Sequence, residues 1–302
     1  MGTLFTNQKN IMKKLMFVAS IAFVAAVLLS ATLKQKEPDP LTPECYISCF
    51  NAETRQLIEL DAAKPDFGKL HPNPIILKDF KALGKTIQFA TADGKMASGY
   101  FIKAKNPSKK WVLVFQEWWG LNDNIKNEAD KLYTELGDVN VLAPDMYDGK
   151  VATTPDSAMV YMRNASADRL DAIVNGAITY SGKDAKIYTI GWCFGGGWSL
   201  QAALLAGKQA AGCVMYYGRP ENNIERLKGL NCDVIGFFAN QDQGINPEVV
   251  TQFEENMKAA GKKLTVYRYN AGHGFANPSN PIYNKEATED AHAKALAFLE
   301  SH

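Results

Sequence analysis

Cysteine and histidine are scarce in this 302-residue sequence, and so is net charge. Five cysteines are too few for a disulfide scaffold in a chain of this length, and no cluster of Cys and His has the spacing of a zinc site. The 33 basic and 32 acidic residues nearly cancel, whereas nucleic-acid-binding proteins usually carry a basic face. The sequence therefore predicts neither a bound metal nor a nucleic-acid partner.

Apolar and aromatic residues are plentiful. Hydrophobic residues make up 46% of the chain and aromatic residues 11%, which is enough to bury a sizeable core and excludes a disordered protein. Neither internal repeats nor low-complexity segments interrupt the chain. We therefore expect one large globular domain, of the size of an enzyme or a binding protein.

Lysines flank an apolar run near the N-terminus. Lys13 and Lys14 precede the uncharged stretch 15–33, and Lys34 and Lys36 follow it. This order is typical of a secretory signal, but the run exceeds the ~7–15 residues of a signal core and approaches the ~20 that span a bilayer. We interpret residues 1–33 as a signal peptide or an N-terminal membrane anchor, and predict an exported protein, periplasmic or otherwise extracytoplasmic, which residues 15–33 would anchor if they are not cleaved.

The segment after this leader, residues 34–84, has weak periodicity and predicts a tether followed by an N-terminal wrap. Cys45 and Cys49 lie within it and are able to pair in an oxidising compartment, although close spacing does not guarantee disulfide geometry. The sequence also leaves open whether Met1 or Met12 is the initiator, since Met12 opens a more compact signal.

Strand and helix patterns alternate from residue 85 to 302. Asp93-Gly94 lies between two β-prone segments and predicts an antiparallel hairpin, and the later strands are separated by helices that imply a mainly parallel sheet covered on both faces. We expect strands at 85–91, 96–103, 111–115, 140–143, 186–190, 212–217, 234–239 and 264–269. We expect helices after Asn122-Asp123 and at about 158–180, 198–206, 247–260 and 285–299.

The motif with the most chemical content is Gly191-Trp192-Cys193-Phe194-Gly195, which follows an expected strand. It has the G-x-nucleophile-x-G pattern of a nucleophile elbow, with Cys in place of Ser. Its glycines permit a tight turn that exposes the central residue, and a following helix N-terminus favours a thiolate and offers N–H groups to an oxyanion. Cys193 is thus a candidate nucleophile, the alternative being a bystander thiol in a Gly-rich turn. Cys213 and Cys232 lie in apolar segments and are expected to be buried core thiols.

Two further residues complete a candidate triad. Asp242 follows the expected strand 234–239, and His273 follows the strand 264–269. The order nucleophile, acid, histidine is that of the α/β-hydrolases, and each residue comes at the carboxyl end of a strand, where a doubly wound sheet places its site. Of the four histidines, only His273 occupies a loop suited to general-base work.

These residues carry a family resemblance. From about Lys85 to the C-terminus the sequence resembles the dienelactone hydrolase family, which has the α/β-hydrolase fold with a mainly parallel central sheet. The matching segments are Val114-Phe115-Gln116-Glu117-Trp118-Trp119-Gly120-Leu121, Ala143-Pro144-Asp145, Gly191-Trp192-Cys193-Phe194-Gly195-Gly196, Asp242 and His273-Gly274-Phe275.

The resemblance implies a role for each residue. Cys193 is expected to be the nucleophile, His273 the base and acid, and Asp242 the carboxylate that orients the histidine. The N–H groups of Phe194 and Trp118 are expected to form the oxyanion hole.

The same resemblance assigns a role to Glu117. In the family the matching glutamate interacts with the thiol and takes its proton when substrate enters, which keeps the resting thiol neutral and limits its oxidation. A structural salt bridge is the alternative reading of a carboxylate that ends a buried strand.

Substrate specificity departs from the family's type enzyme, which grips a substrate carboxylate with arginines. The segment Phe275-Ala276-Asn277-Pro278 and the segment 150–157 contain none. The aromatic residues of the expected site suit an apolar acyl or aromatic pocket instead. We assign to this pocket Trp119, Trp192, Tyr217 and Phe275.

The sequence thus predicts a hydrolase of carboxylic esters or lactones that forms a thioester acyl-enzyme and needs no cofactor. A thioesterase or acyltransferase on the same scaffold is a second reading, and an exported binding protein without turnover is a third. A thiol redox protein is disfavoured because Cys45 and Cys49 do not form a C-x-x-C motif. The oligomeric state is not indicated.

Overall fold

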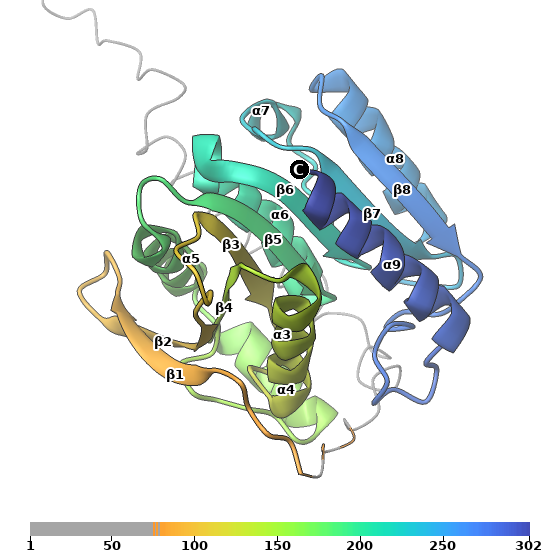
Figure 1. Ribbon diagram of the computed structural model, residues 1–302. Coiled ribbons are helices and arrows are strands. Elements are labelled where there is room, and N and C mark those ends of the chain that lie inside the picture. Colours follow the sequence, from red (N-terminus) through yellow and green to blue (C-terminus); the bar gives the residue numbers. More distant parts are fainter. Residues whose placement is uncertain (1–74, 76, 78) are drawn as a thin grey trace, which may run out of the picture. The chain divides into compact units, whose positions relative to one another are not determined.

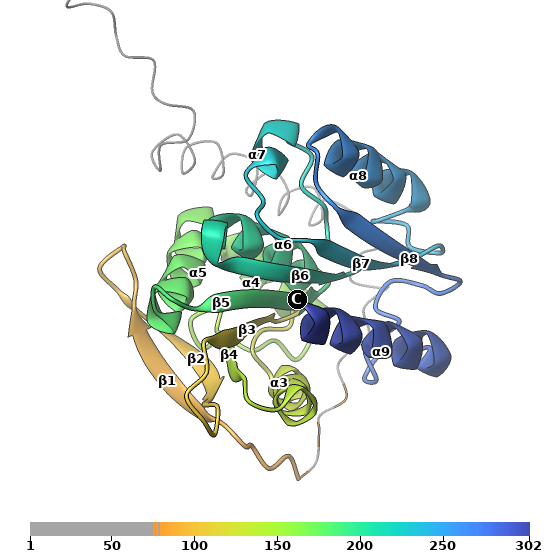
Figure 2. The same cartoon turned by 45° about the horizontal axis from the view of Figure 1, so that its top comes forward.

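The computed structural model describes residues 75, 77 and 79–302, and the predicted leader, Cys45, Cys49 and most of the tether lie outside these residues. An eight-stranded sheet forms the centre, in the order β1-β2-β4-β3-β5-β6-β7-β8 (Figure 1). Its first two strands, β1 (Lys85–Ala90) and β2 (Met96–Ile102), form the predicted hairpin across Gly94, whose φ is 76°. Figure 2 shows this hairpin at one edge of the sheet and β8 at the other.

The remaining strands run parallel, as the alternating pattern predicts. They are β3 (Lys110–Phe115), β4 (Asn140–Pro144), β5 (Lys186–Trp192), β6 (Ala210–Tyr216), β7 (Val234–Ala239) and β8 (Leu264–Tyr269). β2 joins them by pairing antiparallel with β4. The sheet is the mixed, mainly parallel sheet of an α/β-hydrolase fold.

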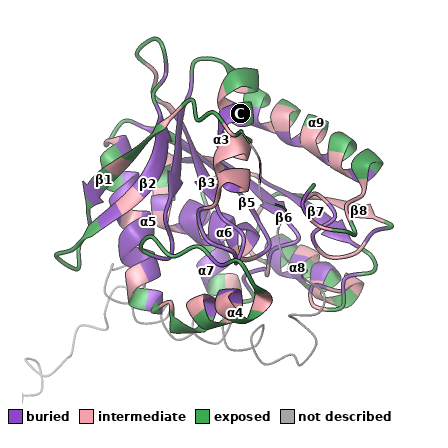
Figure 3. Cartoon of the chain, turned by 90° about the horizontal axis from the view of Figure 1, so that it is seen from below, coloured by how far each residue is buried: buried purple, intermediate pink, exposed green. Residues whose placement is uncertain are grey.

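Helices cover both faces of the sheet. Figures 1 and 3 show α3 (Asp123–Leu136) and α9 (Lys285–Ser301) on one face, and α5 (Ala167–Ser181), α6 (Phe194–Ala206) and α8 (Pro247–Ala259) on the other. The inner strands β3 to β7 are buried between these two layers, and the side chains from Val112 to Phe115 have no exposed area. Such complete burial explains the uninterrupted apolar run of β3.

Helix caps explain where several elements begin. The Asn122 side chain accepts a hydrogen bond from the Ile125 amide at the start of α3, and Asn246 does the same for Val249 at the start of α8.

The prediction of a single helix at 158–180 is wrong. It is two helices, α4 (Pro155–Asn164) and α5, because Ala165 is extended and the Ser166 hydroxyl caps the second helix.

Two other sequence predictions need correction. The helix expected at 198–206 begins four residues earlier, at Phe194, because the glycines of this segment fit the helix and lie tightly against neighbouring backbone. The short helix α7 (Ile224–Lys228) was not predicted, since its single turn shows no periodicity.

Cys213 is buried as expected, and burial raises the pKa of its thiol to about 11, whereas Cys232 is only half-buried.

No helix among residues 75, 77 and 79–302 combines the length and the apolar character needed to cross a bilayer.

Candidate active site

Cys193 lies at the turn between β5 and α6, as the elbow motif predicts. Its φ of 55° and ψ of −118° place it in a backbone region that L-residues rarely adopt. The carbonyl of Cys193 accepts hydrogen bonds from the amides of Gly196 and Gly197, at 3.0 and 3.3 Å, which closes the first turn of α6 directly behind the thiol. The cysteine therefore stands at the positive end of the helix dipole, where a thiolate is stabilised.

The two glycines of the motif are required by close backbone contacts. A Cβ added at Gly191 would lie 2.1 Å from the Gly195 carbonyl oxygen, and one added at Gly195 would lie 2.2 Å from the carbonyl oxygen of Phe115. Both distances are far below van der Waals contact. The strained conformation of Cys193 is thus held by a turn that has no space for side chains on either side of it.

His273 and Asp242 meet at the carboxyl edge of the sheet. The Nδ1 atom of His273 is 2.5 Å from Oδ2 of Asp242, and the other carboxylate oxygen of Asp242 accepts the amides of Gly244 and Ile245 at 2.8 and 3.0 Å. These bonds fix the carboxylate and hold the histidine ring in one orientation. Two of the other histidines lie at the surface, where His292 pairs with Glu135 and His302 with Asp233.

The electrostatics of this pair favour an ionised carboxylate. Burial by itself favours neutral Asp242, but the positive charge of His273 and the hydrogen bonds to the carboxylate lower its pKa to about 2. Burial also opposes the charging of His273, yet Asp242 and Cys193, through their charges and hydrogen bonds, raise the pKa of His273 well above its usual value. The hydrogen bond to the Cys193 side chain joins all three residues in one chain of polar contacts.

Glu117 follows β3 and is buried, with 8% of its surface exposed. Its Oε2 accepts a hydrogen bond of 2.6 Å from Nδ2 of Asn277, a residue that the sequence analysis did not single out. Burial raises the pKa of Glu117 to about 7, and the charge of His273 and the bond from Asn277 limit this rise. The carboxyl group therefore changes its charge near neutral pH, beside the candidate nucleophile and base.

These residues enclose a small cleft of about 10 Å³. One side of the cleft is lined by Cys193, His273, Glu117, Trp118 and Trp119. The loop after His273 supplies the other wall, with Gly274, Asn277, Ser279 and Asn280. A cavity needs roughly 10–15 Å³ to hold one water, so the cleft is almost closed around the thiol and the imidazole.

The residues expected to bind the oxyanion both border this thiol. Phe194 is the first residue of α6, directly after Cys193, and Trp118 is fully buried and lines the cleft. Trp118 packs against Trp119 with ring centroids 4.8 Å apart. The N–H groups assigned to the oxyanion hole therefore come from the two segments that flank Cys193.

The four expected pocket residues occupy different places. Trp119 lines the cleft itself, and Trp192 lines a larger hollow beside it. Tyr217 and Phe275 have no exposed area. The ring of Tyr217 lies 5.1 Å from the ring of His273 and 5.3 Å from that of Phe275. These two aromatic residues support the histidine from the core.

The loop residues 277–280 were not singled out as site residues from the sequence. Asn-Pro and Ser-Asn indicate a turn, and only the fold shows that the turn closes the cleft. Within the described part of the chain, no three His, Cys, Asp or Glu side chains come together in a way that could hold a metal ion.

Comparisons with known proteins agree with this arrangement. The model of the dienelactone hydrolase family matches residues 97–302. A protein named as a carboxymethylenebutenolidase in Saccharolobus solfataricus is 28% identical over 253 residues, which cover 70% of this chain and 96% of that protein. Protein usf of Aquifex pyrophilus is also 28% identical, and the match covers 73% of this chain and 99% of that protein.

Solved structures show the same fold. A protein described as a dienelactone hydrolase from Klebsiella pneumoniae has a TM-score of 0.63 at 19% identity, covering 72% of this chain and 99% of its own. A dienelactone hydrolase-like promiscuous phosphotriesterase from metagenomic libraries has a TM-score of 0.61 at 21% identity, covering 73% of this chain and 99% of its own. The chain therefore belongs to the dienelactone hydrolase family, and it is an ester-hydrolysing enzyme with the α/β-hydrolase fold.

Proposed function

We propose that the enzyme cleaves carboxylic esters or lactones through Cys193, His273 and Asp242, with a thioester acyl-enzyme as the intermediate. The observation that carries the proposal is the position of Cys193. It lies in a strained turn at the N-terminus of α6 and shares a narrow cleft with His273, whose Nδ1 is hydrogen-bonded to Asp242. A bystander thiol would not need this arrangement.

The reaction follows from these contacts. When substrate enters, the Cys193 thiol gives its proton to Glu117, and the thiolate attacks the carbonyl carbon. Negative charge on the carbonyl oxygen is stabilised by the N–H groups of Phe194 and Trp118. The tetrahedral intermediate collapses to a thioester, and His273, which its raised pKa keeps as an imidazolium at rest, protonates the departing alkoxide.

Hydrolysis of the thioester uses the same groups. His273 takes a proton from water, and the resulting hydroxide attacks the thioester carbonyl. Collapse of the second tetrahedral intermediate releases the carboxylic acid and the Cys193 thiolate, which takes its proton back from Glu117. Asp242 stays ionised throughout and stabilises the imidazolium, as its low pKa favours.

A panel of aryl esters, enol lactones and thioesters tests the proposal on the full-length chain. Cys193→Ala and His273→Ala are expected to abolish hydrolysis, whereas Cys232→Ala, which removes a half-buried thiol away from the cleft, is expected to retain it. Full activity of Cys193→Ala would refute the nucleophile assignment. Preference for thioesters would indicate a thioesterase, and tight binding without turnover would indicate a binding protein.

We infer further that residues 1–33 export the protein to the periplasm. The support is the order of lysines and apolar residues in that segment. Cell fractionation with measurement of the intact mass separates the alternatives, because a cleaved signal leaves a shortened periplasmic chain and an anchor leaves a full-length membrane-bound one. A cytoplasmic full-length chain would refute export. The mass before and after thiol alkylation also shows whether Cys45 and Cys49 are paired.

A further inference from the structure

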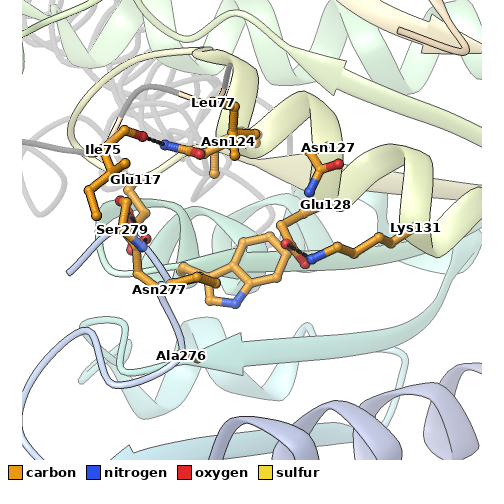
Figure 4. A pocket seen from close by; sticks show the side chains of 13 residues that line it. Ile75, Leu77, Glu117, Asn124, Asn127, Glu128, Lys131, Ala276, Asn277 and Ser279 are labelled. Atoms are coloured by element: carbon orange, nitrogen blue, oxygen red, sulfur yellow. Dashed lines mark hydrogen bonds and ion pairs between the residues drawn. The ribbon is translucent and has the colours of Figure 1, made fainter. Parts of the chain in front are cut away.

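A hollow of about 270 Å³ adjoins the catalytic cleft (Figure 4). Glu117, Asn277 and Ser279 line both spaces, so these side chains form the wall between them. A second hollow of the same volume lies around Leu121 and Lys126. It shares Ile75, Leu77 and Asn124 with the first hollow but no residue with the cleft. The first hollow is therefore placed to receive part of a molecule that reacts at Cys193.

The surfaces of this hollow are mainly apolar. Trp192, Ile125, Ala276 and Pro278 line it. The indole of Trp192, immediately before Cys193 in the chain, stacks on Tyr216 with ring centroids 5.4 Å apart, which gives the hollow a rigid aromatic wall.

Charge in the hollow disfavours an anionic ligand. Figure 4 shows Glu128 and Lys131 together at one end, where their side chains form an ion pair of 2.6 Å. Glu117 lies at the other end, and the hydrogen bond that it accepts comes from a neutral amide, Asn277. A ligand carboxylate would thus meet two glutamates and one lysine that is already paired.

The cleft cannot hold a substrate by itself, since its 10 Å³ has room for about one water. The adjoining hollow, with about 270 Å³, has space for a short alkyl chain or an aromatic ring. The wall between the two spaces consists of side chains. Asn277 is held by Ser279, whose amide and hydroxyl donate to its Oδ1 at 2.8 and 2.7 Å, so Glu117 is the part of the wall able to turn aside.

We propose that this hollow, here named the Trp192 subsite and lined by Glu117, Ile125, Asn127, Trp192, Ala276 and Asn277, binds the uncharged apolar substituent of the ester. The inference rests on the proposed function and assigns its substrate class: esters that carry a short alkyl or aryl group without a carboxylate. Movement of the Glu117 side chain away from Asn277 joins the subsite to the cleft.

Two substrate series test the subsite on the full-length chain. One lengthens the acyl group of a p-nitrophenyl ester from acetate to octanoate, and the other lengthens the alcohol of an acetate ester. In one series kcat/KM is expected to rise about fourfold for each added methylene until the subsite is full. The series that responds identifies which part of the ester occupies the subsite.

A pair of variants on α3 provides the control. Asn127→Phe adds an aromatic ring to the Trp192 subsite, and Lys126→Phe adds the same ring to the hollow that does not adjoin the cleft. Asn127→Phe is expected to remove the dependence on chain length, whereas Lys126→Phe is expected to retain it. An equal dependence in all three proteins, or none in the wild type, would overturn the proposal.

Binding separates this proposal from the catalytic one. Cys193→Ala is titrated with methyl ketones of increasing chain length, which are uncharged and are not hydrolysed. The dissociation constant is expected to fall about fourfold for each methylene, and this trend is expected to disappear when Asn127→Phe is added. If ketones bind in this way while no ester is cleaved, the subsite stands and the proposed function fails. If ketones show no such trend, the subsite is refuted whatever the esterase activity.

Discussion

Replacement of Glu117 by glutamine tests the electrostatics of the cleft through stability. The pKa of this carboxyl is raised from 4.5 to about 7, so the native state holds its proton more tightly than the unfolded state does. The stabilisation is fully present below pH 4.5 and is lost as the pH rises through 7. At ~1.4 kcal/mol for each tenfold change, the loss is about 3 kcal/mol.

Glutamine has the shape of the protonated carboxyl and can still accept the Asn277 hydrogen bond, yet it does not titrate. The difference in unfolding free energy between Glu117→Gln and wild type is therefore expected to shift by about 3 kcal/mol in favour of the variant between pH 4 and pH 8. Urea unfolding followed by circular dichroism at several pH values measures this difference.

A matched control separates this effect from a simple loss of charge. Glu289→Gln removes a carboxylate on α9 whose side chain is 66% exposed. Its unfolding free energy is expected to follow that of the wild type across the same pH range. A Glu117→Gln difference that does not change with pH would refute the assignment of a raised pKa to this buried carboxyl.

Three other perturbations follow from the contacts described. Asp242→Asn is expected to lower kcat/KM by roughly 10³–10⁴-fold, because the histidine loses its orienting anion, and activity near wild type in the ester assay would contradict this. Arg226→Met breaks the buried ion pair with Glu221 and is expected to lower the free energy of unfolding in urea by about 3–5 kcal/mol. Arg268→Met breaks a more exposed pair and is expected to lower it by less than ~1 kcal/mol, so equal losses in the two variants would refute the distinction. Gly195→Ala places a Cβ 2.2 Å from the Phe115 carbonyl oxygen and is expected to lower the thermal midpoint and the activity together, so an unchanged protein would show that the elbow can relax.

The secondary-structure elements predicted best from the sequence are those whose two ends are both marked by neighbouring residues in the chain. β7 and β8 match their predicted bounds because turn residues delimit each run of β-prone residues, whether the strand is buried, as β7 is, or partly exposed at the edge of the sheet, as β8 is. The prediction of a single helix at 158–180 was wrong because the helical pattern of the sequence continues across Ala165 and Ser166. In the structure, the extended backbone of Ala165 and the cap formed by Ser166 divide this segment into two helices.

The sequence by itself determined the order of the chemical groups: an elbow cysteine, then an aspartate, then a histidine, each after a strand. Parallel pairing brings such strand ends to one edge of a sheet, so Cys193, Asp242 and His273 were predictable as neighbours. The contact of His273 with Asp242 at 2.5 Å agrees with that reasoning.

The tertiary structure alone decided what surrounds this group. Asn277 reaches Glu117 across 160 positions of sequence, and Trp192 meets Ile125 and Ala276 from separate elements around one hollow. No local sequence pattern predicts these side-chain contacts, because they depend on how a helix, a strand end and a loop pack together. Strand ends can be aligned from periodicity, whereas the walls of a pocket follow from side chains that are brought together only when the whole domain folds.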